Sequence, residues 1–388
     1  MHQHLCARAE QLKQGGIREF FDKAAKLENI INLGIGEPDF DVPRDVKEAA
    51  IRAVSAGKNH YTANSGIKPL RDAVSTYVSK YGVICDPDKN VIITCGGMGA
   101  VSMALLCSIE PGNEVIIQDP QWLNYSSQIR FAGGVAVPVP VYEENGFAIK
   151  EEDVERAITD NSRVLLLNSP NNPTGGVMGY DDIKALAQLA VKHDLLVISD
   201  EVYCELLYDG RKHISIASFP GMAERTIVVN SLSKTFAMTG WRIGFAIGPA
   251  HFIQQMVYLQ ENFTACAPAP AQYAAAYALD KMSLVEERRK EYARRRELIV
   301  SGLNRIQGIS CIMPAGAFYA FPNFEQWAKN STNTALALLE YAGVAVVPGS
   351  CFGRMGEKHL RFSYASSDSN IIEALNRIDT YAGKYFGK

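Results

Sequence analysis

The chain has 388 residues, of which 47% are hydrophobic, and its 39 basic and 42 acidic side chains give a formal net charge of -3. This length predicts about two domains of ~150 residues each, with a sizeable core. The balanced charge argues against a nucleic-acid partner and against an acidic or basic tail, so small molecules are the expected partners.

The start of the chain, MHQHLCARAEQLKQGG, is polar and charged, and no later stretch reaches the ~18 apolar residues of a membrane span. We therefore expect no signal peptide, no membrane partner and a cytoplasmic location. The eight cysteines are scattered and show no paired CxxC spacing. They are expected to be reduced thiols, and no metal site is predicted.

Helices are predicted first, over about 46–54 and 70–81, because apolar residues recur at helical spacing and a glycine follows each segment. Strands that are apolar on both faces come next, and a helical segment at 180–193 lies among them. Such strands are typical of sheets that are covered by helices on both sides. The strand segments are 90–94, 114–118, 163–168, 195–200 and 226–230. We predict one large α/β domain over 45–282 with a mainly parallel sheet.

The remainder of the chain predicts a smaller α+β domain. From residue 283 a charged helical run, EERRKEYARRRELIVSGL, precedes alternating strands (AFYAF, VAVV, LRFSYA) and a last helix after Ser367. Residues 1–44, which include the glycine-rich INLGIGEPDF, are expected to pack with residues 283–388.

Polar or reactive residues follow several of the predicted strands. CGGMGA (95–100), SPNNPTG (169–175) and SLSKTFAMTGWRIG (231–244) each follow one, and Asp200 of DEVY ends another. In open α/β sheets, ligands bind beyond the carboxyl ends of the strands. One crevice is therefore expected to receive all four segments.

These motifs, in this order and spacing, resemble those of the fold-type I pyridoxal-phosphate aminotransferases. The chain is most similar to the class I enzymes of the prokaryotic aspartate and aromatic aminotransferase group. The resemblance covers nearly the whole chain, from LGIGEPDF through AGAFYAF and VAVVPGSCFG to LRFSYA. It implies an aspartate aminotransferase-like fold and an enzyme that holds pyridoxal 5'-phosphate. Such an enzyme exchanges an amino group between an amino acid and a 2-oxo acid by a ping-pong Schiff-base mechanism.

The resemblance implies catalytic roles for Lys234, Asp200 and Tyr203. Lys234 would form the Schiff base and then carry a proton between the substrate α-carbon and the cofactor. Because free lysine has a pKa of ~10.4, we expect burial and nearby positive charges to lower that pKa. Asp200 would keep the pyridine nitrogen protonated, and Tyr203 would donate to the ring's phenolic oxygen.

The same resemblance implies the binding residues. Asn172 would bond the phenolic oxygen from its other side, and Trp122 would stack on the cofactor ring. Arg361 would bind the substrate α-carboxylate in bidentate fashion, together with Asn172 and backbone near Gly36.

The phosphate would be bound by backbone N–H groups at a helix start and by side chains after the fifth predicted strand. These residues are Gly97, Met98, Gly99, Ser231, Ser233 and Arg242. Tyr61 would reach the phosphate from the partner subunit, so a homodimer with shared active sites is expected.

Other enzyme classes fit the motifs less well. Gly97-Met-Gly99 lacks the third glycine of a dinucleotide fingerprint, which argues against hydride transfer to nicotinamide. Ser231 and Lys234 satisfy the S-x-x-K spacing of penicillin-binding enzymes, but no SDN motif accompanies them. A C–S lyase of the same fold stays open, because it would use the same Schiff base.

The substrate prediction depends on Met98. Relatives that prefer dicarboxylic substrates place a lysine at this position, and a thioether cannot pair with a second carboxylate. We therefore favour an aromatic or otherwise apolar amino donor, with 2-oxoglutarate as a possible acceptor. Aspartate aminotransferase is the alternative.

Overall fold

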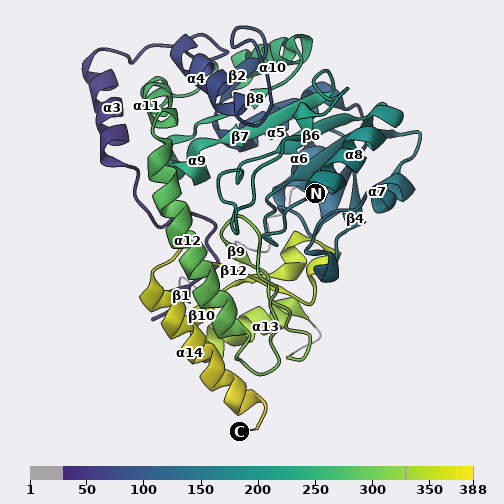
Figure 1. Cartoon of the computed structure of the whole chain (residues 1–388), viewed down its shortest axis with the longest axis vertical. Coiled ribbons are helices and arrows are strands. Elements are labelled where there is room, and N and C mark those ends of the chain that lie inside the picture. The colour runs from purple at the N-terminus through teal and green to yellow at the C-terminus, as the bar shows by residue number, and fades with distance from the viewer. Residues whose placement is uncertain (1–28, 328–329, 388) are drawn as a thin grey trace, which may run out of the picture.

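The computed structural model describes residues 29–327 and 330–387, and its largest element is a seven-stranded sheet (Figure 1). β8 runs antiparallel to both of its neighbours, and all other neighbouring strands are parallel. The sheet is therefore mainly parallel, as predicted. Its strands, in spatial order, are β2 (Val91–Thr94), β8 (Gly244–Ile247), β7 (Thr226–Ser231), β6 (Leu196–Asp200), β5 (Ser162–Asn168), β3 (Glu114–Asp119) and β4 (Val135–Pro140).

All five predicted strand segments form strands, and β4 and β8 are additional to them. β4 is an edge strand that contains Pro138 and Pro140. Prolines in a sequence argue against a strand. An edge strand tolerates them, because one of its sides forms no backbone hydrogen bonds with a neighbouring strand. β8 is short and begins at Gly244, the last residue of the 231–244 motif.

Helices cover both faces of this sheet. Val164 and Leu166 of β5 are buried in one core with residues of α5 (Gly96–Ser108) and α10 (Ala250–Phe263). Leu165 and Leu167 are buried on the opposite face with residues of α8 (Tyr180–Lys192). Burial on both faces explains why the strands read as continuous apolar runs.

The remaining helices flank this sheet and the smaller sheets. The two early segments predicted as helices form α3 (Arg44–Ser55) and α4 (Lys68–Ser79), which pack with α11 (Ala269–Leu279). The others are α6 (Asn124–Phe131), α7 (Glu151–Ala157), α9 (Leu232–Thr235), α12 (Met282–Leu303), α13 (Ser331–Ala337) and α14 (Asp368–Tyr385). The side chain of Ser367 caps α14 by accepting the backbone N–H of Asn370, which fixes its predicted start.

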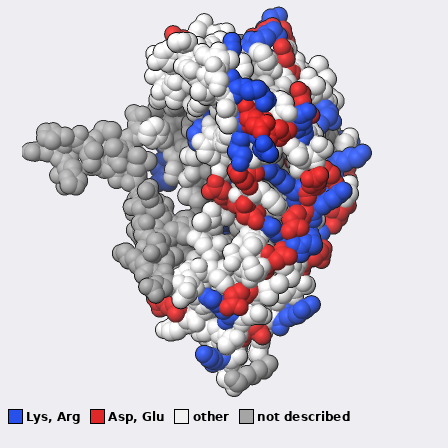
Figure 2. Space-filling model, turned by 90° about the vertical axis from the view of Figure 1, so that its left-hand side faces the viewer, with Lys and Arg blue, Asp and Glu red and all other residues white. Residues whose placement is uncertain are grey.

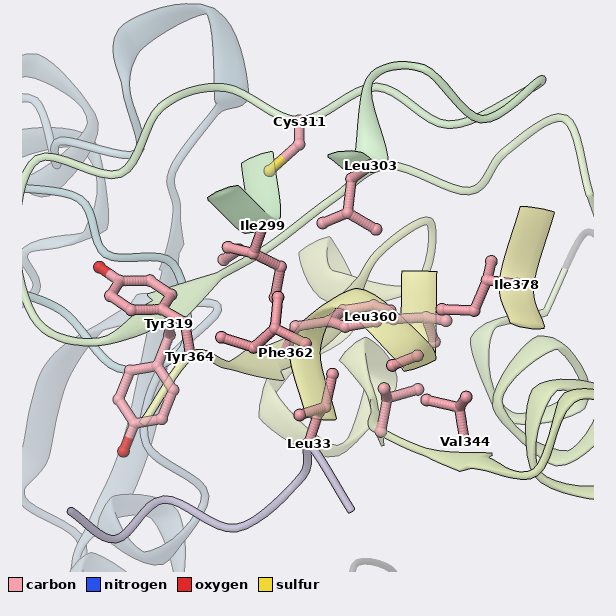
Figure 3. Close-up of a cluster of buried hydrophobic side chains, with 14 of the residues drawn as sticks. Leu33, Ile299, Leu303, Cys311, Tyr319, Val344, Leu360, Phe362, Tyr364 and Ile378 are labelled. Atoms are coloured by element: carbon pink, nitrogen blue, oxygen red, sulfur yellow. The ribbon is translucent and has the colours of Figure 1, made fainter. Parts of the chain in front are cut away.

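Two small sheets lie below the large one in Figure 1. β11 (Val347–Pro348), β12 (Leu360–Ser363) and β9 (Tyr319–Ala320) are antiparallel neighbours, and β1 (Ile31–Asn32) runs parallel to β10 (Val344–Ala345). Figure 3 shows Leu33 in one core with Leu360, Phe362 and Ile378. The segment after Asn29 thus packs with the last hundred residues of the chain, and residues 1–28 of the predicted small domain lie outside the described residues.

The surface in Figure 2 carries basic and acidic side chains that are interspersed rather than separated by sign. No helix within residues 29–327 and 330–387 is both long enough and apolar enough to cross a membrane.

Candidate active site

A cavity of about 400 Å³ lies at the carboxyl ends of the parallel strands, between the large sheet and β9 and β12. β5 ends at Asn168, β6 at Asp200 and β7 at Ser231, and all three residues line it. It brings together most of the site residues predicted from sequence. Those that line it are Gly36, Gly97, Met98, Trp122, Asn172, Asp200, Tyr203, Ser231, Ser233, Lys234, Arg242 and Arg361.

Gly99 and Tyr61 do not line this cavity. Gly99 is the fourth residue of α5, one turn after the start of the helix at Gly96. The side chain of Tyr61 is 88% exposed and belongs to a loop before α4. Tyr61 therefore contributes nothing to the site of its own chain.

Lys234 lies in α9, the short helix that follows β7. Its Nζ donates to the backbone oxygen of Gly36 at 2.6 Å. Burial lowers the pKa of Lys234 to about 8, and the positive charges of Arg361 and Arg242 act in the same direction. The amine therefore loses its proton far more readily than a solvated lysine does.

Asp200 is the last residue of β6 and is only 7% exposed. Burial raises the pKa of Asp200 to about 6, although the Tyr125 hydroxyl opposes this by donating to Oδ2 at 2.7 Å. The backbone N–H of Val202 donates to Oδ1 at 3.1 Å. This carboxylate is thus fixed in position but lacks a cationic partner within hydrogen-bond distance among the described residues, so a cationic ligand group would stabilise it.

Arg361 lies in β12 and reaches the cavity from the side opposite the large sheet. Its Nη1 donates to Oδ1 of Asn172 at 2.9 Å, and its Nη2 donates to the backbone oxygen of Gly34 at 2.7 Å. The rings of Tyr319 and Phe352 lie 4.6 and 4.8 Å from the guanidinium. Its Nε is buried and has no hydrogen-bond partner in the described part of the chain. A buried guanidinium that meets no carboxylate is suited to an anionic ligand.

The start of α5 also has features that suit an anion. The first turn of a helix has free N–H groups, and Gly97 and Met98 line the cavity there. Gly96 has φ +73°, and a Cβ on it would lie 2.5 Å from Nη2 of Arg242. The guanidinium is therefore packed against the helix start, and buried Ser231 and Ser233 add hydroxyl groups. Positive charge and free donors at one place suit a phosphate.

Eight residues that line the cavity were not predicted from sequence: Gly34, Ile35, Leu123, Tyr125, Asn168, Val202, Thr239 and Tyr319. Asn168 donates to the backbone oxygen of Asp200 at 3.0 Å and accepts the N–H of Asn172 at 3.0 Å. Its position at a strand end is a signal that sequence could have used. Tyr125 and Tyr319 read as ordinary core residues, since only their tertiary contacts distinguish them.

Comparison with known proteins decides the family. The sequence profile described as "Aminotransferase class I and II" matches residues 28–378. The chain is 44% identical to "Aspartate aminotransferase" of Pyrococcus abyssi over 96% of each chain. It is 43% identical to "Aromatic-amino-acid aminotransferase 2" of Thermococcus litoralis over 97% of each. The solved aromatic aminotransferase of Pyrococcus horikoshii superimposes with a TM-score of 0.90 at 42% identity, over 94% of this chain and 99% of that one.

The chain belongs to the class I and II aminotransferases. Enzymes of this family use pyridoxal 5'-phosphate, so this aminotransferase is a pyridoxal-phosphate enzyme, as the motifs predicted. The cavity fits that cofactor. It is large enough for a small ligand, and it offers an anion site at α5, a buried carboxylate at Asp200 and an amine of lowered pKa at Lys234. Arg361 is then available to bind a second anion.

Proposed function

We propose that this aminotransferase takes an aromatic or otherwise apolar amino acid as donor and a 2-oxo acid such as 2-oxoglutarate as acceptor. The composition of the cavity wall carries this proposal. Ile35, Met98, Leu123 and Val202 line it, and the cationic side chains among the described lining residues are Lys234, Arg242 and Arg361. Each of these three has a role with the cofactor or the α-carboxylate, so no lining cation is left for a side-chain carboxylate.

In the proposed mechanism, bound pyridoxal phosphate supplies an electron-accepting ring that stabilises the charge left when the α-carbon loses its proton. Lys234 holds the cofactor covalently at rest, and its Nζ then carries that proton. The lowered pKa supports this role, because the free amine is accessible near neutral pH. Asp200 pairs with the ring nitrogen, and Tyr203 and Asn172 hold the phenolic oxygen.

We propose that Gly97, Met98, Ser231, Ser233 and Arg242, which all line the cavity, bind the phosphate and that Trp122 stacks on the ring. Arg361, Asn172 and backbone near Gly36 would bind the substrate α-carboxylate. The backbone oxygen of Gly34 supports this role by orienting the guanidinium from behind, at 2.7 Å from Nη2. The Nε of Arg361, which is buried without a described partner, supports the same role.

The proposal includes a homodimer in which Tyr61 completes the partner's phosphate site, and the 88% exposure of this large aromatic side chain supports it. We also propose the domain division at 45–282 against 1–44 and 283–388. The pairing of β1 with β10 supports placing the segment near residue 31 with the small domain. A cytoplasmic location stays a prediction from sequence.

Substrate kinetics test the proposal. We expect kcat/KM for phenylalanine and tyrosine to exceed that for aspartate, and Met98→Lys to raise kcat/KM for aspartate by ~10-fold or more. The matched control is Met313→Lys, because Met313 is similarly exposed (39% against 44%) but does not line the cavity. A wild-type preference for aspartate would overturn the substrate class. Release of ammonia and an oxo acid from a C–S substrate without any acceptor would favour the lyase instead.

A further inference from the structure

Tyr319 contacts three of the proposed site residues, although the mechanism above gives it no role. Its hydroxyl oxygen lies 2.8 Å from that of Tyr203, and its ring lies 4.6 Å from the guanidinium of Arg361. A Cβ added to Gly36 would meet the same hydroxyl at 2.6 Å. Tyr319 is 1% exposed and lines the cavity.

The Tyr203–Tyr319 hydrogen bond can run in either direction, because each hydroxyl has one proton and two lone pairs. A ligand oxygen beside Tyr203 removes this freedom. If Tyr203 donates its proton to the phenolic oxygen, the 2.8 Å contact is a hydrogen bond only when Tyr319 donates to Tyr203. A hydroxyl that accepts a hydrogen bond is in turn a stronger donor, since such chains polarise one another.

We propose that Tyr319 is a positioning residue that donates to Tyr203 and thereby strengthens the hydrogen bond from Tyr203 to the cofactor's phenolic oxygen, while its ring supports Arg361. This inference rests on the proposed role of Tyr203. It gives the two ends of Tyr319 separate functions: the hydroxyl acts on the cofactor, and the ring acts on the substrate carboxylate site.

Tyr364, a neighbouring tyrosine, serves as the control for a purely structural role. Tyr364 is also fully buried in the same core as Tyr319, and Figure 3 shows both side chains. Its hydroxyl donates to the backbone oxygen of Ala317 at 3.1 Å, and it does not line the cavity. Tyr364→Phe therefore removes one buried hydroxyl hydrogen bond without touching the chain from Tyr319 to the cofactor.

The test is the pH titration of the visible absorbance of the holoenzyme, which reports the pKa of the linkage between Lys234 and the cofactor. Losing that linkage's proton leaves more negative charge on the phenolic oxygen, so a good donor to this oxygen lowers the pKa. We expect Tyr203→Phe to raise it most, and Tyr319→Phe to raise it by about half a pH unit to one unit. Tyr364→Phe should leave it unchanged, and in the Tyr203→Phe background Tyr319→Phe should add nothing.

The ring is tested by kinetics. Tyr319→Phe keeps an aromatic face beside Arg361, so KM for the amino acid should stay within about twofold, whereas Tyr319→Leu should raise it ~3-fold or more. Equal absorbance pKa values for wild type and Tyr319→Phe, with a shift in Tyr203→Phe, would overturn the inference and leave the proposed function standing. Equal shifts from Tyr319→Phe and Tyr364→Phe would reduce Tyr319 to a structural residue. A wild type without pH-dependent cofactor absorbance would instead contradict the proposed function.

Discussion

Loss of solvation moves the pKa values of two ionisable side chains at this site in opposite directions. The pKa of Asp200 is raised to about 6 and that of Lys234 is lowered to about 8, in each case mainly by loss of solvation. Burial therefore makes both charged forms costly in the cofactor-free protein. A ligand that brings a cationic ring nitrogen and consumes the amine relieves both costs, and this favours tight cofactor binding.

The proton-carrying role of Lys234 predicts the effect of its removal. Lys234→Ala should retain bound cofactor but lose transamination by ~10²-fold to 10⁴-fold, because the described residues that line the cavity include no second lysine and no histidine. Single-turnover kinetics, with cofactor content read from absorbance, measure both quantities. Lys150→Ala is the control, because that lysine pairs with Asp182 outside the cavity. Unchanged turnover in Lys234→Ala would remove the assignment.

The raised pKa of Asp200 also predicts a pH dependence of stability. The folded cofactor-free protein holds a proton on Asp200 up to about pH 6, whereas the unfolded chain releases it near pH 3.8. The folded state thus binds more protons in this window, and the free energy of unfolding falls as pH rises from about 4 to 6. The free energy of unfolding of Asp200→Asn should not fall in this way. The variant should be more stable than wild type at pH 7, by up to about 3 kcal/mol. Urea unfolding of both proteins at pH 4 and pH 7 checks this, and an equal pH slope would contradict it.

At the scale of one element, the start of α5 depends on two backbone requirements. Gly96 adopts φ +73°, which favours glycine, and Gly244 of β8 lies so close that a Cβ on it would be 2.5 Å from the carbonyl carbon of Gly96. β8 therefore sets how closely the helix start approaches the sheet. The proposed phosphate site depends on this contact and on Arg242, which packs on Gly96.

Gly96→Ala tests that arrangement, and Gly57→Ala is its control. Both glycines have nearly the same φ, +73° and +74°, so both substitutions should cost about 1 to 2 kcal/mol of stability. Only Gly96 has Arg242 where the methyl group would be, since a Cβ built on Gly57 would meet no described residue within 4 Å other than its chain neighbours. We expect only Gly96→Ala to weaken pyridoxal phosphate binding, by ~10-fold or more in Kd. Equal Kd values for the two variants would contradict a packed anion site.

At the scale of the whole molecule, the site joins parts of the chain that are far apart in sequence. Arg361 of β12 bonds Asn172 across 189 positions, and Lys234 bonds Gly36 across 198. α12 runs from beside the large sheet to the core around β12 (Figure 1). The proposed substrate carboxylate site at Arg361 and the proposed cofactor site at Lys234 are thus carried by different sheets, so their spacing depends on how these sheets pack.

The expected dimer gives a prediction at the same scale. Light scattering should give twice the mass of one chain, and Tyr61→Phe should raise the Kd of pyridoxal phosphate because a hydroxyl from the partner is lost. We expect about a 3-fold to 10-fold change, as for one hydrogen bond to a charged group. Tyr180→Phe serves as control, because Tyr180 is also exposed, at 57%. A monomer, or an unchanged Kd for Tyr61→Phe, would contradict the shared site.

The sequence by itself determined many local features of this protein: the strands β2, β3, β5, β6 and β7, the helices α3, α4 and α8, and the residues that follow the strand ends, including Asn172, Asp200 and Lys234. These follow from periodicity and motif, which are properties of neighbouring residues. The tertiary structure alone decided the strand order, the antiparallel β8 and the partners Tyr125, Tyr319 and Gly34. A buried tyrosine has the same sequence pattern whether its hydroxyl meets a backbone oxygen or a catalytic side chain, because that choice depends on contacts made only when distant segments pack.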